Sequence, residues 1–282
     1  LPLRRVSFRP ISITVGSVLN EGSAAVLRMS CRVQAWNSGA WEFAARLGGP
    51  LLKVMTPELD PIVRLLALHP QTQIVVRKYF SLEEQADRLN RGYDGGVQVA
   101  NEVMIHYADI INWCNAHGVT VWAEALNEPP AQTFEDIDRL VTFTNGFIDQ
   151  MTPARPVIFC FSVGQPDDYV PRREKWERLY PVMRRAKAKG AAWEYHGYGW
   201  PDVRNEPMYY ALRPRLTKAE GMPEDLHDMP LIYGECGLDR GITGGAPPGI
   251  RAEDWAGWTN AGITPDQYAE QLVWLDAEYD KD

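Results

Sequence analysis

The chain has 282 residues and a formal net charge of −8. Hydrophobic residues make up 45% of it and charged residues 23%, which is ordinary for a globular protein. The acidic balance argues against nucleic acid or an anionic membrane as a partner, because both attract clustered lysine and arginine. No apolar run approaches the roughly 20 residues that a membrane-spanning helix needs.

The four cysteines lie far apart in the chain and form no Cys-x-x-Cys pair. This spacing predicts buried free thiols rather than a metal site or a disulfide framework. The chain begins at Leu1 and shows no charged segment followed by an apolar one, as a signal peptide would. The cellular compartment and the oligomeric state are therefore left open.

Residues 1–30 are predicted to be an N-terminal extension of a single domain at residues 31–282. Within the extension, residues 11–18 (Ile-Ser-Ile-Thr-Val-Gly-Ser-Val) are β-branched and alternate well enough to form one strand. In a closed barrel the last strand lies beside the first, so this segment could pack there.

From residue 31 onward, short apolar runs alternate with segments whose apolar residues recur three and four positions apart. The predicted strands are Arg32–Trp36, Leu51–Met55, Gln73–Tyr79, Thr120–Leu126, Val157–Phe161, Ala192–Tyr198 and Pro230–Gly234. The clearest helical patterns run from Val99 to Cys114 and from Ile137 to Ile148. A last helix is expected to start at Thr264, with Thr264 and Gln267 forming a capping box.

This alternation predicts a parallel sheet, and its regular spacing favours a (β/α)8 TIM barrel over a doubly wound sheet. No Gly-x-Gly-x-x-Gly follows the first strand, and no P-loop is present, which weakens the nucleotide-binding alternative. The eighth strand is not evident, because the pattern ends in a helix near residue 279. Either the N-terminal segment supplies that strand or it is missing from the chain.

Two of the predicted strands end in a glutamate followed by a breaking residue. The fourth runs into Asn127-Glu128-Pro129, and the seventh into Gly234-Glu235 before Gly237. A carboxylate beside a dry core is costly unless it is paired or functional. Two such glutamates at the carboxyl ends of barrel strands predict a two-carboxylate site of the kind that cleaves glycosidic bonds.

Further polar residues lie on the same predicted strands. His196 and Tyr198 are two apart on the sixth strand, so their side chains point to the same face of the sheet. Arg77 and Lys53 interrupt apolar strands and need partners, which makes them candidate pocket residues. Glu124 shares the parity of Glu128 and is predicted to be a structural partner of Lys53 or Arg77.

These motifs give residues 31–279 a resemblance to the clan A glycoside hydrolases, which include cellulases, mannanases and β-galactosidases. The resemblance implies that Glu128 is the acid/base, that Glu235 is the nucleophile, and that Asn127 binds the sugar 2-hydroxyl. It also implies that His196 and Tyr198 contact the substrate and the nucleophile, and that a basic residue, Arg77 or Lys53, orients the nucleophile. Trp200 could provide the aromatic platform that the eighth strand usually brings.

The sequence therefore predicts a retaining glycoside hydrolase that acts on β-linked glycosides or polysaccharides with no cofactor and no metal. One alternative is a catalytically silent barrel that binds carbohydrate. Another is an unrelated barrel enzyme with glutamates as proton-transfer bases or metal ligands, although no His/Asp cluster accompanies the strand ends. The sugar, its linkage and the choice between endo and exo cleavage depend on loops that motifs do not describe.

Overall fold

The computed structural model describes residues 31–36, 38–166, 172–243, 260–279 and 281. The predicted strand at residues 11–18 lies outside these ranges. In the described part, seven parallel strands pair strictly in chain order, from β1 to β7. Their bounds are β1 Cys31–Val33, β2 Leu51–Val54, β3 Gln73–Val76, β4 Val121–Glu124, β5 Arg155–Phe161, β6 Ala192–Gly199 and β7 Leu231–Leu238.

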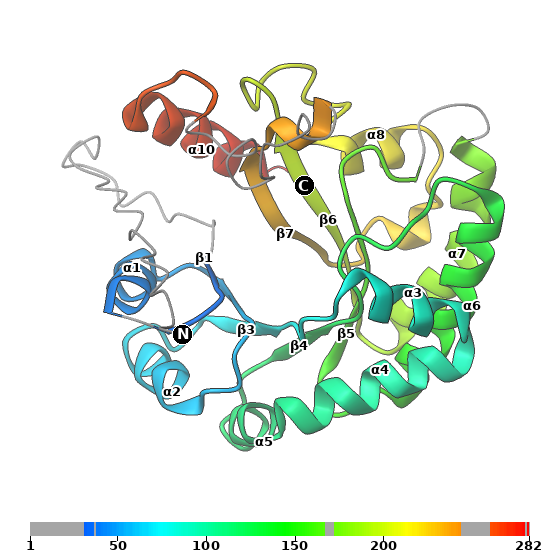
Figure 1. Cartoon of the computed structure of the whole chain (residues 1–282), viewed down its shortest axis with the longest axis horizontal. Helices are drawn as coiled ribbons and strands as arrows, with labels where there is room; N and C mark the ends of the chain where they lie inside the picture. The colour runs from blue at the N-terminus through cyan, green and yellow to red at the C-terminus, as the bar shows by residue number, and fades with distance from the viewer. Residues whose placement is uncertain (1–30, 37, 167–171, 244–259, 280, 282) are drawn as a thin grey trace, which may run out of the picture.

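Helices follow the strands and cover the outside of the curved sheet (Figure 1). They are α1 Ser38–Leu47, α2 Leu59–Leu68, α3 Leu82–Asn90, α4 Tyr93–His106, α5 Ala108–Ala116, α6 Phe134–Gln150, α7 Arg172–Ala188, α8 Arg213–Ala219 and α10 Pro265–Tyr279, with 3₁₀ turns η1 Glu224–Leu226 and η2 Arg240–Thr243. The architecture is that of a (β/α)8 barrel with seven of its strands in the described residues. The barrel prediction is confirmed.

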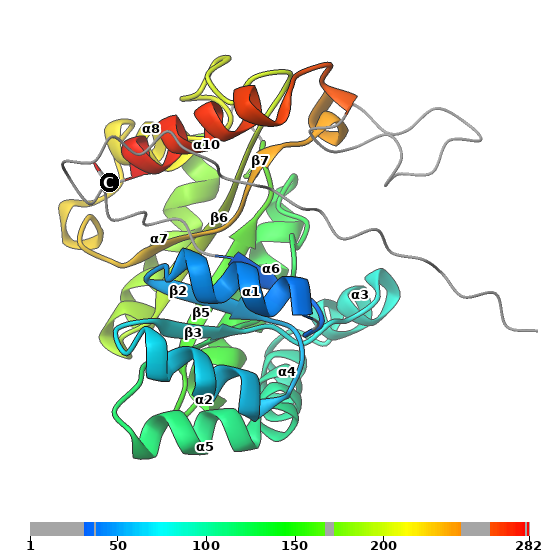
Figure 2. The same cartoon turned by 90° about the vertical axis from the view of Figure 1, so that its left-hand side faces the viewer.

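The sheet curls without closing in the described part of the chain, because β1 and β7 each have one strand partner there. Figure 1 shows these two strands at the two ends of the curl, and Figure 2 shows α10 running beside β7. The rings of Tyr233 on β7 and Tyr279 on α10 stack with their centroids 3.6 Å apart. This contact holds the last helix against the open end of the sheet.

Most of the hydrophobic core lies between the sheet and its helices, where apolar helix faces pack against the outward-facing side chains of the strands. Capping residues in the sequence mark the starts of several helices. Ser81 and Glu84 form a capping box on α3, and Thr133 and Asp136 form another on α6. The capping box predicted at Thr264 and Gln267 is confirmed by both of its hydrogen bonds.

The pattern from Val99 to Cys114, which looked like one helix, is divided into α4 and α5 at Tyr107. Tyr107 is fully buried, and its hydroxyl donates a 2.6 Å hydrogen bond to the carbonyl of Arg77. The helical periodicity continues across the break because both helices pack against the same core. No helix in the described ranges is long and apolar enough to cross a bilayer.

Candidate active site

Inside the curl, the strands stack their inward side chains in layers. The lowest layer is apolar and consists of Leu51, Val75, Trp122, Val157, Ala192 and Ile232. Because strand side chains alternate, the residues two positions further on form the next layer. On four strands these residues are charged, namely Lys53, Arg77, Glu124 and Glu194. The alternation of a parallel sheet thus places a charged layer directly above an apolar base.

On β5 and β7, bulges change the alternation. On β5 the register shifts between Ile158 and Phe161, with positive φ angles at Phe159 (75°) and Cys160 (46°). As a result Cys160, three residues after Val157, faces inward. On β7, Tyr233 pairs with Tyr195 and Glu235 pairs with His196, so that Gly234 is the extra residue. Without this bulge the alternation would send Glu235 to the opposite face from Ile232.

Gly234 also leaves room for a neighbouring carboxylate. A Cβ atom at this position would lie 1.5 Å from Oε1 of Glu194, closer than any non-bonded contact allows. Any larger residue must therefore displace Glu194 or the strand. The bulge and the missing side chain together bring β7 against the buried acid on β6.

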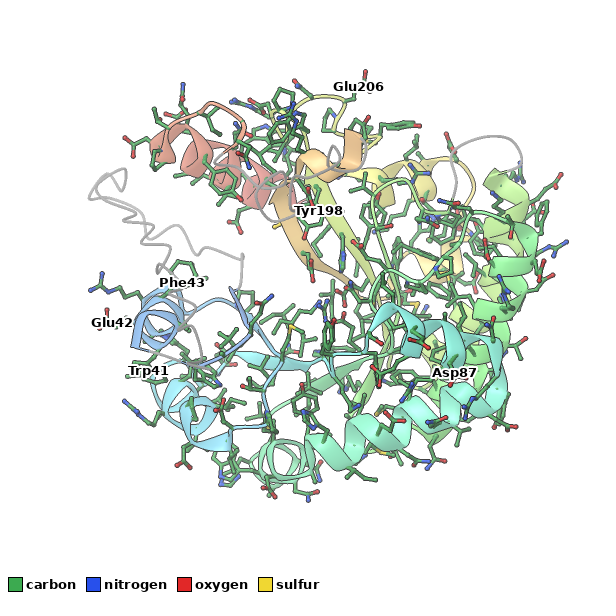
Figure 3. The ribbon with its side chains drawn as sticks, in the orientation of Figure 1. Trp41, Glu42, Phe43, Asp87, Tyr198 and Glu206 are labelled. Carbon is green, nitrogen blue, oxygen red and sulfur yellow. The ribbon has the colours of Figure 1, made fainter. Side chains whose placement is uncertain are left out.

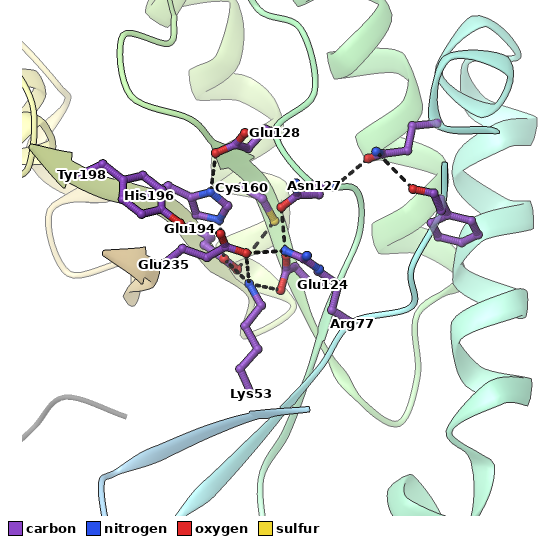
Figure 4. Close-up of polar contacts among 12 residues, drawn as sticks. Lys53, Arg77, Glu124, Asn127, Glu128, Cys160, Glu194, His196, Tyr198 and Glu235 are labelled. Carbon is purple, nitrogen blue, oxygen red and sulfur yellow. Dashed lines mark hydrogen bonds and ion pairs between the residues drawn. The ribbon is translucent and has the colours of Figure 1, made fainter. Parts of the chain in front are cut away.

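Lys53 is at the centre of the charged layer (Figure 4). Its ammonium donates a 2.9 Å hydrogen bond to Glu194. It also forms an ion pair with Glu124 at 2.6 Å and lies 4.0 Å from Glu235. Burial by itself lowers the pKa of Lys53, but the surrounding carboxylates outweigh it and raise that pKa above its ordinary value. Lys53 is therefore a permanent cation, and its contact with Glu124 is the structural pairing that was predicted for Glu124.

Glu235 is held by two donors above this layer. Nη1 of Arg77 lies 2.7 Å from its Oε1, and the hydroxyl of Tyr198 donates to Oε2 at 2.6 Å. The Glu235 side chain is only 13% exposed. Burial and the charge of Glu235 raise the pKa of Tyr198 well above its ordinary range, so the hydroxyl keeps its proton and remains a donor.

Glu128 stands in a different environment, in the loop after β4. Its backbone has a positive φ of 48°, uncommon for a residue with a side chain, and its N–H donates to the carbonyl of Cys160 at 3.1 Å. This strained turn places the carboxylate at the mouth of the barrel, which is the end where the strands have their carboxyl termini. The side chain is 36% exposed there. Its Oε1 lies 2.7 Å from Nδ1 of His196.

His196 is fully buried and connects two carboxylates. Its other nitrogen, Nε2, lies 3.1 Å from Oε1 of Glu194. Burial lowers the pKa of His196, but the hydrogen bonds to Glu128 and Glu194 outweigh it and raise the pKa to about 9. Burial opposes the charge of Glu194 as well, yet Lys53 and His196 lower its pKa to about 2.

Asn127 is fixed from both sides. Its side-chain oxygen accepts a 2.6 Å hydrogen bond from Nη1 of Arg77, and its N–H donates to the side chain of Gln85 at 2.8 Å. Arg77 itself is 5% exposed and also lies 3.5 Å from Glu124. Arg77 and Lys53, which the sequence offered as pocket residues, are thus below the mouth with their charges directed at carboxylates.

The structure brings seven of the eight sequence-predicted site residues into this polar cluster. They are Lys53, Arg77, Asn127, Glu128, His196, Tyr198 and Glu235. Tyr198 lies within the curl of strands, whereas Trp41, Glu42 and Phe43 project from α1 on its outside (Figure 3). Trp200 packs in a separate apolar cluster with Leu238 and Leu275, and the guanidinium of Arg240 lies 5.7 Å from its ring.

Sequence reasoning missed Glu194, Cys160 and Gln85. Glu194 has the same parity as His196 and Tyr198 in an otherwise apolar strand, a signal that could have identified it. Cys160 faces inward only because β5 is bulged, and the sequence gives no sign of that bulge. Gln85 lies on α3, far from the strand ends in the chain, and reaches Asn127 by its side chain.

One group of side chains has metal-binding atoms close together. Donor atoms of Glu124, Cys160 and Glu194 lie within 4.8 Å of one another. This set does not fit a cation, because Lys53 already contacts both carboxylates. Burial also raises the pKa of the Cys160 thiol well above its ordinary value, whereas a metal ligand must be a thiolate.

The sequence matches no family model and no curated protein. Among solved structures, the chain is similar to that of a plant β-glucan endohydrolase, one of two that are described together as having distinct substrate specificities. The identity is 12% and the TM-score 0.47, over 87% of this chain and 84% of the other. It is also similar to the catalytic domain of the Thermobifida fusca endoglucanase Cel5A (12% identity, TM-score 0.40, 84% of this chain and 70% of the other). A similarity of this degree assigns no activity to the chain.

Proposed function

We propose that the chain is a retaining glycoside hydrolase that cleaves β-linked glycosides or polysaccharides with two glutamates and no metal or organic cofactor. The observation that carries the proposal is the contrast between the two carboxylates. Glu235 is shielded and held by Arg77 and Tyr198, whereas Glu128 is open to the mouth and bonded to His196. Double displacement needs one fixed, ionised nucleophile and one proton-transferring group.

In the first step, a Glu235 oxygen attacks the anomeric carbon while Glu128 gives a proton to the leaving glycosidic oxygen. In the second step, Glu128 takes a proton from water, the water oxygen bonds to the anomeric carbon, and Glu235 is released. Arg77 and Tyr198 keep Glu235 ionised and oriented between turnovers. Asn127, aligned by Arg77 and Gln85, is the proposed partner of the sugar 2-hydroxyl.

The first test is hydrolysis of a panel of β-linked polysaccharides and aryl β-glycosides by the wild type, Glu235→Ala and Glu128→Ala. We expect turnover by the wild type and its loss in Glu235→Ala. We also expect azide to rescue Glu128→Ala on a dinitrophenyl glycoside, because that leaving group needs no acid. Glu102→Ala, a paired glutamate on α4, is the matched control and should retain full activity.

The stereochemistry and the covalent intermediate have their own measurements. Proton NMR during early hydrolysis should show the β-anomer of the product first. A 2-deoxy-2-fluoro glycoside should label Glu235, as found by peptide mass spectrometry. Full activity of Glu235→Ala would overturn the proposal, and binding of glycans without hydrolysis by the wild type would favour the silent carbohydrate-binding barrel instead.

A further inference from the structure

The contacts of His196 set it apart from a simple hydrogen-bonding residue at the mouth. Both ring nitrogens have a carboxylate oxygen as partner, Glu128 at 2.7 Å and Glu194 at 3.1 Å. When both carboxylates are ionised they only accept hydrogen bonds, so both nitrogens then donate, and an imidazole donates from both only as the imidazolium. A carboxylate partner at each nitrogen therefore favours the charged form of the ring (Figure 4).

The arrangement around the ring keeps that charge in place. Glu194 is fully buried, and the Oε1 atom that contacts His196 also accepts a hydrogen bond from Lys53. Its Oε2 accepts from the thiol of Cys160 at 3.6 Å. Glu194 thus has fixed donors and is unavailable to substrate. Glu128, at the other nitrogen, is the one of these three residues whose side chain reaches the mouth of the barrel.

We propose that Glu194, His196 and Glu128 form an acid chain, in which His196 stores the proton that Glu128 delivers to the glycosidic oxygen and Glu194 is the positioning residue that keeps the ring charged. This inference rests on the proposed function, since it assigns the source of the catalytic proton. It gives His196 a role at Glu128, whereas the sequence resemblance placed it at the substrate and the nucleophile.

The proton transfers balance over one cycle. As the glycosidic C–O bond breaks, the leaving oxygen gains one proton through Glu128, and Nδ1 of His196 loses one, so the ring becomes neutral. In the second step, water gives its oxygen to the anomeric carbon and one proton to Glu128. That proton returns to Nδ1, which restores the imidazolium without an external acid.

Charged and titratable groups around the ring come from β2 through β7 and from the loop after β4. The acidic groups are Glu128 after β4, Glu194 on β6, Glu235, which is the register partner of His196 on β7, and further below Glu124, whose pKa burial raises. Opposing charges are on Lys53 and Arg77, and the neutral neighbours are Tyr198 and the Cys160 thiol. The pKa of about 9 for His196 agrees with this balance, in which the two directly bonded carboxylates outweigh burial.

The ring is observed directly by nitrogen NMR of histidine-labelled protein during a pH titration. We expect a midpoint near 9 for His196 in the wild type, and a midpoint lower by about one unit or more in Glu194→Gln and in Glu128→Gln. Glu128→Gln alters only a partly exposed rim residue, so it remains informative if Glu194→Gln fails to fold. A wild-type midpoint near the ordinary value of about 6.5, or midpoints unmoved in both variants, would overturn the acid chain.

The kinetic test compares two leaving groups on the same sugar. With a sugar or alkyl leaving group, the alkaline limb of kcat/KM should lie near 9 in the wild type and move to lower pH in Glu194→Gln. With a dinitrophenyl leaving group, which needs no proton, both proteins should share one profile. Glu102→Gln on α4 is the matched control and should leave both profiles unchanged.

The two failures are distinguishable. No turnover of any glycoside by the wild type would overturn the proposed function and the delivery step with it. Turnover by a wild type whose alkaline limb is unchanged in a folded Glu194→Gln would overturn the acid chain alone.

Discussion

One nitrogen of Arg77 joins Glu235 to Asn127. Nη1 lies 2.7 Å from the Glu235 carboxylate on β7 and 2.6 Å from the Asn127 side chain after β4. Arg77 is itself fixed by the hydroxyl of Tyr107, which bonds its carbonyl. The proposed nucleophile and the proposed 2-hydroxyl partner therefore take their positions from one guanidinium on β3.

Arg77→Lys should keep a positive charge but lose this shared contact, because an ammonium lacks the planar fork of a guanidinium. We expect kcat/KM to fall about 100-fold, the typical effect of a misplacement of roughly 1 Å. The measurement is steady-state kinetics on the substrate found in the panel. Arg64→Lys, whose guanidinium lies over Trp41 on the outside of the barrel, should retain activity. Wild-type activity in Arg77→Lys would contradict the assignment.

Tyr198→Phe should remove one hydrogen bond from Glu235 and little else. Such bonds to charged groups contribute about 1.5–3 kcal/mol, so we expect kcat/KM to fall by roughly 10- to 100-fold. Because the bond is also lost from the free protein, urea denaturation should show a decrease of no more than about 1.5–3 kcal/mol in the free energy of unfolding. Tyr180→Phe on α7, a buried tyrosine outside the site, serves as the control. Equal kinetics in the two variants would remove Tyr198 from the site.

Gly234→Ala should disrupt the site from below. The added Cβ would lie 1.5 Å from Glu194 Oε1, so either that carboxylate or β7 must move. We expect a loss of several kcal/mol in the free energy of unfolding, of the order found when a buried ion pair is broken. Gly118→Ala is the control, because Gly118 has a φ of 71° but nothing near its Cβ position. It should cost only about 1 kcal/mol of backbone strain. Equal losses would mean that the contact with Glu194 is unimportant.

The barrel could be predicted from the sequence because each strand carries its own apolar run and breaking residues. The bounds were less accurate where tertiary contacts decide them. The third strand was predicted to reach Tyr79 but ends at Val76, and the seventh was predicted to end at Gly234 but continues to Leu238. The extra length of β7 comes from pairing with β6, a partner that a local pattern does not contain.

The site was predictable to the extent that alternation controls it. Lys53, Arg77 and Glu124 each lie two residues after an inward-facing apolar residue of the same strand, so they face inward too. They pair with one another because an unpaired buried charge is costly. Glu235 was identified by its motif, but its inward direction depends on the bulge at Gly234. Cys160 was missed for the same kind of reason. A bulge is a property of two paired strands, so one strand's sequence does not reveal it.

Chelation should leave activity unchanged. The ammonium of Lys53 lies 2.6 Å from the carboxylate of Glu124 and 2.9 Å from that of Glu194, in the place that a metal cation would need. Kinetics after treatment with EDTA, and again after addition of Mg²⁺ or Zn²⁺, should give the same kcat/KM. Loss of activity with EDTA and its return with one metal would revive the metal-dependent barrel enzyme.

Stability should decrease as pH rises through the range in which His196 holds its proton only in the folded state. Its pKa is about 9 in the fold, against an ordinary value of 6.5. Both states are protonated below about 6.5, so the contribution is complete there, and it is lost as pH rises through about 9. The shift of 2.5 units, at 1.36 kcal/mol per unit, corresponds to about 3 kcal/mol.

Urea denaturation between about pH 6 and 8.5 would measure this slope. Higher pH is avoided because burial raises the pKa of Cys114 to about 11, and its thiol adds a slope of the same sign above its ordinary value of 9. His196→Gln should flatten the dependence, since no proton is then bound differently by the two states at this position. His117→Gln is the control, because His117 is exposed on the C-terminal side of α5. A wild-type slope equal to that of His196→Gln would mean that the buried ring is neutral and that the two carboxylates do not hold its charge.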